Sequence, residues 1–392
     1  MGARTRIPLG PSRPRVILHY WGRRGGGSQF TLFLAQHLRN AGGKTDVVLS
    51  LAQQNDDIAS FRAGGFPIVA MDRPGLPTLW RKGWSLPQQL RRHADTLAAL
   101  KPDTVIITMN SPFAWPFIRM LQRRGLKVAY VAHDAEPHPG DYAATWQRTT
   151  QDILIRRADQ VVTLSTSVAV RLHERIPAAR DKISVIPLET VYPANDAPVP
   201  GRPQAEAPIR LLFFGRLIPY KGLRLLAEAL EPLRSHPNWQ LTIAGSGPLE
   251  PEVRKLFGEW GQVTLELGWI SNDRISELFL NHHLLVCPYV EASQSGVVAQ
   301  ALTWAMPSLV MPTGALPEQV GFGAAGLVAG TPDADGLRRS LRTLIEEPCR
   351  LPELSRGAAA LLAERHRNRG WVQLIEAARG QHRPLTPEAP GE

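Results

Sequence analysis

Two positively charged side chains follow an apolar run in the second half of the chain. Arg216 comes directly after the run IRLLFFG, and Lys221 follows a short turn, with Gly222 behind it at the start of a helical pattern. A diphosphate needs paired positive charge, for which arginine offers a fork of N–H donors and lysine a point charge. The pair could bind a diphosphate, or the two residues could simply be surface cations in a strand-to-helix loop.

A carboxylate and several small polar residues follow another apolar run. The segment VCPYVEASQSGVVAQAL places Glu291 just past this run, and Ser293, Ser295 and Gly296 then precede an apolar helix. The N–H groups of Ser295, Gly296 and Val297 would form an anion site at the positive end of the helix dipole. Either serine could instead only cap the helix. A carboxylate beside a phosphate is unfavourable unless it binds hydroxyls, so Glu291 indicates a sugar ligand.

The first half contains a glycine-rich loop after the run VILHYW. The loop GRRGGG ends at Gly27, and a helix is expected from Gln29 to Arg39. A dinucleotide site would need the pattern G-x-G-x-x-G and an acidic residue at the end of the second strand, whereas that run ends at Gln53. A dehydrogenase is therefore not expected, and the loop is a candidate for backbone contacts with phosphates or an acceptor.

Polar side chains crowd the end of a third strand-like run, KVAYVAHD. His133 and Asp134 end the run, and Glu136 and His138 follow closely. A histidine at a strand end is either a structural hydrogen-bonding group or part of a ligand site. The four residues could also be metal ligands. We expect no metal, because Arg216 and Lys221 would already supply the positive charge.

Short apolar runs alternate with amphipathic stretches through both halves of the chain, which predicts parallel sheets buried on both faces by crossover helices. The fold class is α/β, with two Rossmann-like, doubly wound domains facing a cleft and ligands at the carboxyl ends of the strands. The predicted parts are a first, acceptor-side domain over 1–191, a Pro-rich linker over 192–208, a donor-binding domain over 209–365, a C-terminal helix over 366–380 packing back on the first domain, and a disordered tail over 381–392.

The composition is that of a globular protein, with 392 residues of which 43% are hydrophobic and 20% charged. The two cysteines, Cys287 and Cys349, have no metal-binding spacing, so we expect a reducing compartment. No apolar run has the length of a signal-peptide core or a membrane span. The prediction is a cytoplasmic protein.

The formal net charge is +10, and basic pairs concentrate before the predicted linker. They are either solvated surface or a binding face for an anionic membrane or a lipid phosphate, which would make the protein peripheral at the inner membrane face. Nucleic acid is not expected as a partner, because the pairs are not interleaved with aromatic residues. The pairs are Arg23-Arg24, Arg81-Lys82, Arg91-Arg92, Arg123-Arg124 and Arg156-Arg157.

Four runs, GRLIPYKG, IAGSGPLEPEV, EASQSG and TGALPEQV, together resemble the retaining nucleotide-sugar glycosyltransferases of the GT-B fold, the family 4-like "glycosyl transferases group 1". The resemblance implies that Arg216 and Lys221 clamp the donor diphosphate, that Glu291 binds the donor sugar, and that His133 acts on the acceptor side. Further donor-binding residues implied are Gly215, Gly245, Gly247, Ile270, Ser295, Gly296, Val297 and Gln300; those of an acceptor or phosphate loop are Gly26, Gly27 and Asp134.

The chain departs from this family at one position. The family has two glutamates eight positions apart, and the second would fall on Ala299 counting from Glu291, or on Gln300 counting back from Pro307. A glutamine at position 300 can still hydrogen-bond a ribose hydroxyl, but without charge assistance.

The resemblance implies transfer of a sugar, with retention, from a UDP- or GDP-sugar to a glycan or lipid-linked acceptor in polysaccharide or glycolipid assembly. No cofactor is expected beyond the nucleotide sugar itself. Two alternatives stay open: a non-catalytic nucleotide-sugar binding protein, and a GT-B epimerase or phosphorylase. A phosphorylase would need a lysine for pyridoxal phosphate, for which the chain offers no distinctive candidate.

Overall fold

The computed structural model describes residues 13–23, 25–40, 45–72, 85–111, 113–137, 144–188 and 208–380. The chain divides into two compact units. Unit 1 consists of residues 1–164, 168–186 and 368–392, and unit 2 of residues 165–167 and 187–367. Outside the described residues lie the predicted tail, the predicted linker up to residue 207, and Arg24, Arg81, Lys82 and His138.

The described part of unit 1 contains a parallel sheet in the order β3-β2-β1-β4-β5-β6-β7. Its central strands are nearly continuous apolar runs and are buried along their length, as a sheet covered on both faces requires. The strands are β1 (Arg15–Tyr20), β2 (Asp46–Ala52), β3 (Ile68–Met71), β4 (Thr104–Ile107), β5 (Val128–Ala132), β6 (Gln160–Thr163) and β7 (Ile183–Val185).

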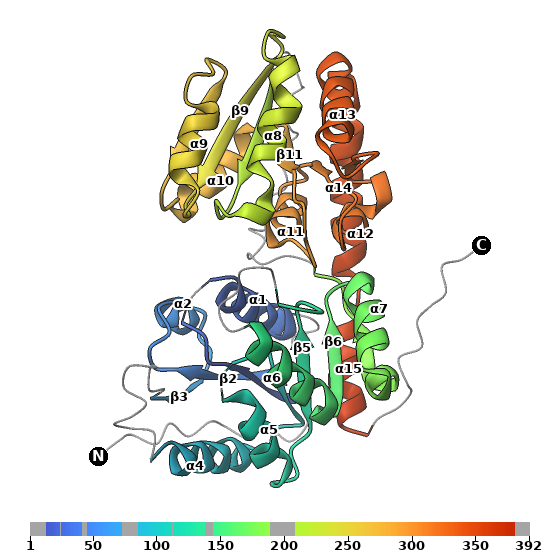
Figure 1. The fold of residues 1–392 in the computed structure, drawn as a ribbon. Helices are drawn as coiled ribbons and strands as arrows, with labels where there is room; N and C mark the ends of the chain where they lie inside the picture. Colours follow the sequence, from blue (N-terminus) through green and yellow to red (C-terminus); the bar gives the residue numbers. More distant parts are fainter. Residues whose placement is uncertain are drawn as a thin grey trace, which may run out of the picture. The chain divides into compact units, whose positions relative to one another are not determined.

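The helices of unit 1 connect these strands (Figure 1) and cover the sheet. They are α1 (Gly26–Asn40), α2 (Ile58–Ala63), α4 (Leu86–Ala99), α5 (Ala114–Gln122), α6 (Ala144–Arg157) and α7 (Thr166–Arg175). The late helix α15 (Gly370–Ala378) also belongs to this unit. Its Trp371 ring lies 6.2 Å from the Phe30 ring of α1, and Arg379 pairs with Asp103 at 3.4 Å.

Unit 2 contains a second parallel sheet, in the order β10-β9-β8-β11-β12-β13. Its strands are β8 (Ile209–Phe214), β9 (Trp239–Gly245), β10 (Val263–Leu267), β11 (Leu284–Cys287), β12 (Ser308–Val310) and β13 (Gly326–Val328). Its helices are α8 (Leu223–Leu230), α9 (Glu250–Phe257), α10 (Asn272–Asn281), α11 (Gly296–Thr303), α12 (Leu316–Gln319), α13 (Ala334–Glu346) and α14 (Leu351–His366).

The strand order of unit 2 determines where a ligand site would form. The chain builds outward from β8 through β9 to β10, and then returns to the other side of β8 with β11. Such a reversal leaves the loops after β8 and β11 beside each other at the carboxyl edge of the sheet. The prediction of two Rossmann-like, doubly wound domains is confirmed.

One helix boundary differs from its prediction. Helix α1 begins at Gly26, whereas the sequence pattern placed its start at Gln29. The Gly25 carbonyl accepts hydrogen bonds from the N–H groups of Ser28 and Gln29, and Gly25 itself has a φ of 94°. Glycines at the start of a helix carry no hydrophobic periodicity, so the pattern missed the first turn.

No helix among the described residues combines the length and apolarity needed to cross a bilayer.

Candidate functional site

The carboxyl edge of unit 2 brings the loops after β8 and β11 into direct contact. The Val290 N–H donates to the Tyr220 carbonyl at 3.0 Å. Gly222 has a φ of 71°, and a side chain on it would overlap the Pro288 carbonyl. Only glycine accommodates both the left-handed backbone and this close approach. The turn that carries Lys221 is thereby held against the segment that leads to Glu291.

Lys221 is a buried cation in this loop contact, with only 9% of its surface exposed. Its Nζ lies 3.6 Å from the centroid of the Tyr289 ring, a cation–π contact. The pKa of Lys221 is lowered to about 8, mainly by burial; Cys287 opposes this shift and the nearby charge of Arg216 adds to it. A bound anion would favour the charged ammonium and relieve this cost.

Arg216 lies at the surface of the same loop. Its Nη2 donates to the Tyr220 hydroxyl at 3.1 Å, and its charge acts on Lys221. The two cations predicted to bind a diphosphate therefore lie near each other, one exposed and one buried. This is the arrangement in which one side chain can reach out to a ligand while the other is fixed in place.

The N-terminus of α11 borders the same loops. Ser295 is its N-cap, and the Ser295 Oγ accepts a hydrogen bond from the Val298 N–H at 3.4 Å. Val297 lies close to Gly215, since its Cγ2 is 3.7 Å from the place where a Gly215 side chain would begin. Lys221, Gly215 and the start of α11 are thus gathered at the switch point of the sheet.

One expectation about these N–H groups needs correction. The sequence predicted that Ser295, Gly296 and Val297 would all offer free donors, but the Ser295 N–H donates to Oε1 of Gln319 at 2.7 Å. The donors that remain for a ligand are the N–H groups of Gly296 and Val297. Sequence reasoning missed Gln319, because nothing in the run TGALPEQV points to a partner in the loop of Ser295.

The loop after β9 packs against the loop after β8. Gly245 has a φ of 143°, and a side chain there would overlap the Gly215 carbonyl. Gly247 packs equally closely on the backbone of Leu217, whose N–H donates to the Ser246 carbonyl at 2.9 Å. These predicted donor-binding glycines therefore set the distance between neighbouring loops.

The predicted hydroxyl-binding residues differ in accessibility. Glu291 is half-buried and Ser293 is 4% exposed. Gln300 is 3% exposed, and its Oε1 has no hydrogen-bond partner in the described part of the chain. Ile270 is half-buried after β10, next to the 87% exposed Trp269. Gln300 thus carries an unsatisfied acceptor, which is a costly state for a buried amide.

The carboxyl edge of unit 1 carries the acceptor-side candidates. His133 Nε2 donates to the Thr108 carbonyl at 2.8 Å, and its ring meets Phe30 edge-on at 4.8 Å. Burial lowers the pKa of His133, although Asp134 partly opposes the shift, so the imidazole is neutral near pH 7. The Asp134 carbonyl accepts from Gln151 at 2.6 Å.

The predicted glycine loop forms the first turn of α1. Gly26 has open space where a side chain would stand, whereas a side chain on Gly27 would meet Met109 and the Tyr20 ring. The backbone at Gly26 is therefore reachable by a ligand. Of the proposed metal set, His138 lies outside the described residues, and the residues that are described contain no group of three or more metal-ligating side chains.

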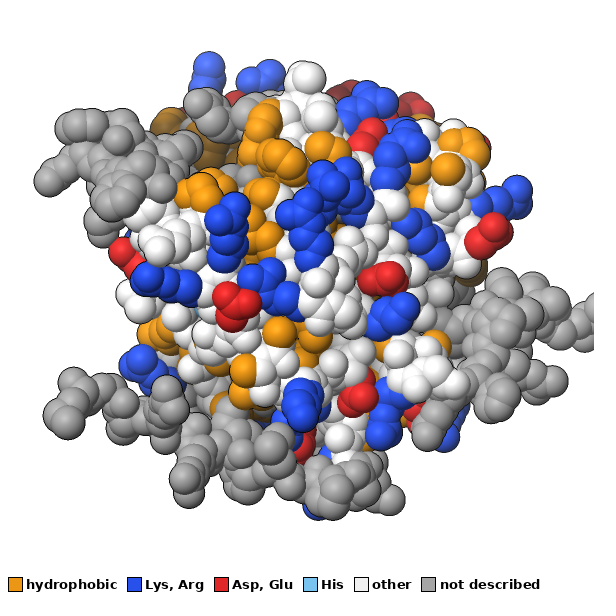
Figure 2. Space-filling model, turned by 90° about the horizontal axis from the view of Figure 1, so that it is seen from below, with side chains coloured by type: hydrophobic (Ala, Val, Ile, Leu, Met, Phe, Trp, Pro, Cys, Tyr) orange, Lys and Arg blue, Asp and Glu red, His pale blue; other side chains and the backbone are white. Residues whose placement is uncertain are grey.

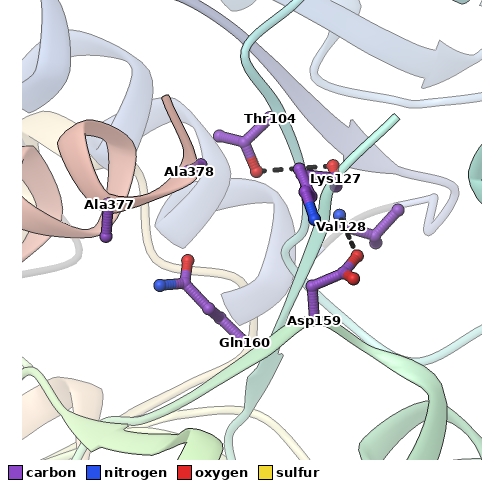
Figure 3. A pocket seen from close by; sticks show the side chains of 7 residues that line it. All are labelled: Thr104, Lys127, Val128, Asp159, Gln160, Ala377 and Ala378. Atoms are coloured by element: carbon purple, nitrogen blue, oxygen red, sulfur yellow. Dashed lines mark hydrogen bonds between the residues drawn. The ribbon is translucent and has the colours of Figure 1, made fainter. Parts of the chain in front are cut away.

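A small pocket lies at the opposite, amino edge of the unit 1 sheet (Figure 3). It has a volume of about 170 Å³ and is lined by residues at the starts of three strands and by α15. Thr104, Val128 and Gln160 are the strand-start residues, and Ala377 comes from α15. None of the sequence-predicted site residues lines it.

A buried polar cluster in unit 1 also escaped prediction. Ser50 Oγ lies 2.9 Å from His19 Nδ1 and 2.7 Å from His93 Nε2. Burial lowers the pKa of His93 to about 4 and that of His19 well below its usual value. The cluster therefore consists of neutral groups inside the core.

Comparison with known proteins places each unit in a family. Residues 24–188 match "Glycosyltransferase Family 4", and residues 208–347 match "Glycosyl transferases group 1". The 2-deoxystreptamine glucosyltransferase of Streptomyces kanamyceticus is 26% identical over 56% of this chain and 57% of its own length. The GDP-mannose:glycolipid 4-beta-D-mannosyltransferase of Xanthomonas campestris is 29% identical over 38% of this chain and 44% of its own length. The chain spans less than two thirds of either relative.

Among solved structures, the fold is similar to that of HepE from Anabaena in complex with UDP and glucose. The TM-score is 0.66 with 16% sequence identity, over 93% of this chain and 97% of that one. At this identity the similarity concerns the fold alone.

Proposed function

Because this chain belongs to the glycosyltransferases of the GT-B fold, we propose that it transfers a sugar from a nucleotide-diphosphate donor to a glycan or lipid-linked acceptor. The observation that carries the proposal is the gathering of Lys221, Arg216 and the start of α11 at the switch point of unit 2. A buried ammonium, in a turn that contacts the segment leading to the N-terminus of α11, is suited to a polyanion.

The charge that develops as the donor bond breaks resides on the leaving diphosphate. Arg216, Lys221 and the N–H groups of Gly296 and Val297 would stabilise this charge more strongly in the transition state than in the ground state, which makes them catalytic. We propose that these groups replace a divalent metal and that no cofactor is needed.

Hydroxyl contacts would orient the donor. We assign the transferred sugar to Glu291 and a ribose hydroxyl to Gln300, whose unpartnered Oε1 is an acceptor for such a group. We assign the acceptor to the carboxyl edge of unit 1, with His133, Asp134 and the backbone at Gly26 and Gly27. The departing phosphate would help to deprotonate the attacking hydroxyl on the same face, so that the anomeric configuration is retained.

The donor is proposed to be a UDP- or GDP-sugar. The name of one relative includes GDP-mannose and a glycolipid acceptor, and the HepE structure contains UDP. We propose a role in the assembly of surface polysaccharide or glycolipid, at the cytoplasmic side of the membrane. A nucleotide-sugar binding protein without activity is the second candidate, because Ala299 or Gln300 stands where the family resemblance implies a second glutamate.

Thermal-shift measurements with a panel of UDP- and GDP-sugars test the proposal first, because a bound donor stabilises the folded state by mass action. At least one donor should raise Tm, and that donor should then be transferred or hydrolysed in the presence of excess chelator. A panel without any shift would contradict donor binding. Binding without any turnover would favour the second candidate, and NMR of the product's anomeric proton tests retention.

We also propose that unit 1 contacts anionic lipid through its basic residues. Lys and Arg side chains spread over the face shown in Figure 2, with acidic side chains between them. Arg156 and Arg157 are exposed at the end of α6, shortly before β6, and Arg123 and Arg124 come shortly before β5, so these pairs lie at the amino edge of the sheet. The acceptor-side candidates His133 and Asp134 follow β5 and therefore lie at the opposite, carboxyl edge.

Each basic residue near such a surface would contribute about 1 kcal/mol. Co-sedimentation at low salt should show more protein on anionic than on neutral vesicles, and the double change Arg156→Gln and Arg157→Gln should reduce it. The matched pair in unit 2, Arg254→Gln with Lys255→Gln, should have no effect. Equal binding to both kinds of vesicle would mean that the basic pairs are solvated surface.

A further inference from the structure

The side chain of Gln319 is joined to the backbone at the start of α11 by two hydrogen bonds. The Ser295 N–H donates to Oε1 at 2.7 Å, and Nε2 donates to the Ser295 carbonyl at 3.0 Å. Both residues are buried, with 3% and 2% of their surfaces exposed. Because both bonds fall on one residue, they fix the directions of the two peptide groups that flank Ser295.

The loop before α12 adds a second contact between the same two segments. Gly314 has a φ of 54°, and a side chain on it would overlap the Ala292 carbonyl. The stretch 313–319 therefore lies against the stretch 291–295 at both ends. The N-terminal end of α11 is therefore held by the loop after β12 as well as by its own capping serine.

Gln319 is itself held by a buried cation. Arg365 of α14 is 8% exposed, and its Nη2 donates to the carbonyls of Gln319 at 2.9 Å and Glu318 at 3.2 Å. Its Nη1 donates to the Leu188 carbonyl at 3.4 Å. Carbonyls at a helix C-terminus lack helical partners, and a cation there is favourable. Arg365 thus binds the carbonyl groups at the C-terminal end of α12, where Gln319 contacts Ser295.

We propose that Gln319 is a positioning residue of the donor site, and that Arg365 holds it in place. Gln319 accepts the hydrogen bond from the Ser295 N–H, so this group is not available to a ligand. The fixed backbone then directs the N–H groups of Gly296 and Val297 toward the diphosphate. An oriented N–H loses most of its value when it is misdirected, since hydrogen bonds weaken steeply with angle. The nature of the ligand rests on the proposed function, whereas the effect on the backbone does not.

Hydrogen exchange of the unliganded full chain tests the backbone effect. Gln319→Leu keeps the side chain's approximate size and removes both bonds, so amides of the segment 292–300 should exchange roughly tenfold faster or more. The matched control is Gln262→Leu, which removes a 2.9 Å bond from Nε2 to the Arg234 carbonyl at the amino edge of the same sheet. The control should leave the segment unchanged. Unchanged exchange in folded Gln319→Leu would overturn the proposal.

Nucleotide binding tests the functional consequence. Gln319→Leu should lower the affinity for UDP roughly tenfold to a hundredfold, whereas the affinity for uridine, which has no phosphate, should change less than about twofold. Equal losses for both ligands would mean general loosening of unit 2 and would overturn the positioning role. If the wild type binds neither UDP nor GDP, the proposed function fails, and hydrogen exchange still decides whether Gln319 fixes α11.

Arg365 provides an independent variant. Arg365→Met should raise the hydrogen-exchange rate in the same segment by a smaller factor than Gln319→Leu, because the two hydrogen bonds of the Gln319 side chain remain. Arg365→Lys should restore part of the protection. If Arg365→Met does not fold, Gln319→Leu alone decides. A folded Arg365→Met with normal exchange would remove Arg365 from the proposal.

Discussion

The carboxyl edges of the two sheets share one topology but differ in their chemistry. The edge of unit 2 has a buried ammonium at Lys221, an exposed guanidinium at Arg216 and the start of α11. The edge of unit 1 has a neutral imidazole at His133 and the open backbone at Gly26. One edge is suited to a polyanion and the other to hydroxyl groups. The two edges therefore differ only in the residues that follow the strands, and this difference underlies the two substrate sites that we propose.

The largest expected effect comes from removing a cation at the unit 2 edge. Lys221→Ala and Arg216→Ala should each lower turnover by about a hundredfold, because each removes a group that we propose stabilises the leaving diphosphate. Steady-state kinetics measures the loss. Lys255→Ala and Arg254→Ala, exposed cations on α9, are matched controls expected to retain activity. Full turnover in either variant would contradict the proposed role of that cation at the unit 2 edge.

Glu291 should affect the chemical step more than donor binding. Glu291→Gln would remove the charge-assisted hydrogen bond that we propose to the transferred sugar, so the single-turnover rate should fall about thirtyfold. The donor dissociation constant should change much less, since the diphosphate contacts remain. A silent Glu291→Gln would show that the carboxylate faces solvent and that the sugar lies elsewhere.

His133 tests the unit 1 edge on its own. His133→Ala should raise the KM for the acceptor about tenfold, the value of a lost hydrogen bond of ordinary strength, and leave the donor dissociation constant unchanged. His173→Ala, a change on α7, is the control. Because His133 Nε2 donates to Thr108, the variant's Tm must be measured too. A large loss of Tm with an unchanged KM would make His133 purely structural.

The fold was predictable because its signal is repeated in every strand, whereas the site depended on single contacts. Apolar runs such as IRLLFFG predicted buried parallel strands, and the residues after these strands could be selected as site candidates from topology alone. The burial of Lys221 under Tyr289 could not be predicted, because nothing local distinguishes it from an exposed loop lysine. The same is true of Gln319, whose partner Ser295 lies in another loop, and of the polar Ser50 cluster inside the core.

The pH dependence of donor binding should distinguish the buried cation from the exposed one. Burial lowers the pKa of Lys221 to about 8, so the ammonium is mostly charged at pH 7 and mostly neutral at pH 9. UDP affinity should therefore fall by about fivefold as pH rises through this range. Lys221→Arg should abolish the fall, since arginine stays charged. A fall that persists unchanged in Lys221→Arg would assign it to another group.

The smallest effect is expected at Gln300, which we propose takes the place of the family's second glutamate. Gln300→Glu should raise the affinity for the donor by about threefold, since a charge-assisted hydrogen bond is roughly twice as strong as a neutral one. Burial favours the protonated form of a carboxyl at this position, so the tightening should grow as pH rises. Calorimetric titration with UDP at two pH values measures it.

Gln300→Leu separates a role in binding from a role in stability. The Oε1 atom is buried and has no hydrogen-bond partner among the described residues, so its removal should leave the Tm of the unliganded protein unchanged or raise it. The same change should weaken UDP, because a ribose hydroxyl would lose its acceptor. A residue that costs stability when empty and strengthens binding when occupied is retained for its ligand. If Gln300→Leu and Gln300→Glu both bind UDP as the wild type does, the ribose lies away from α11, and the unsatisfied amide belongs to the packing of unit 2 alone.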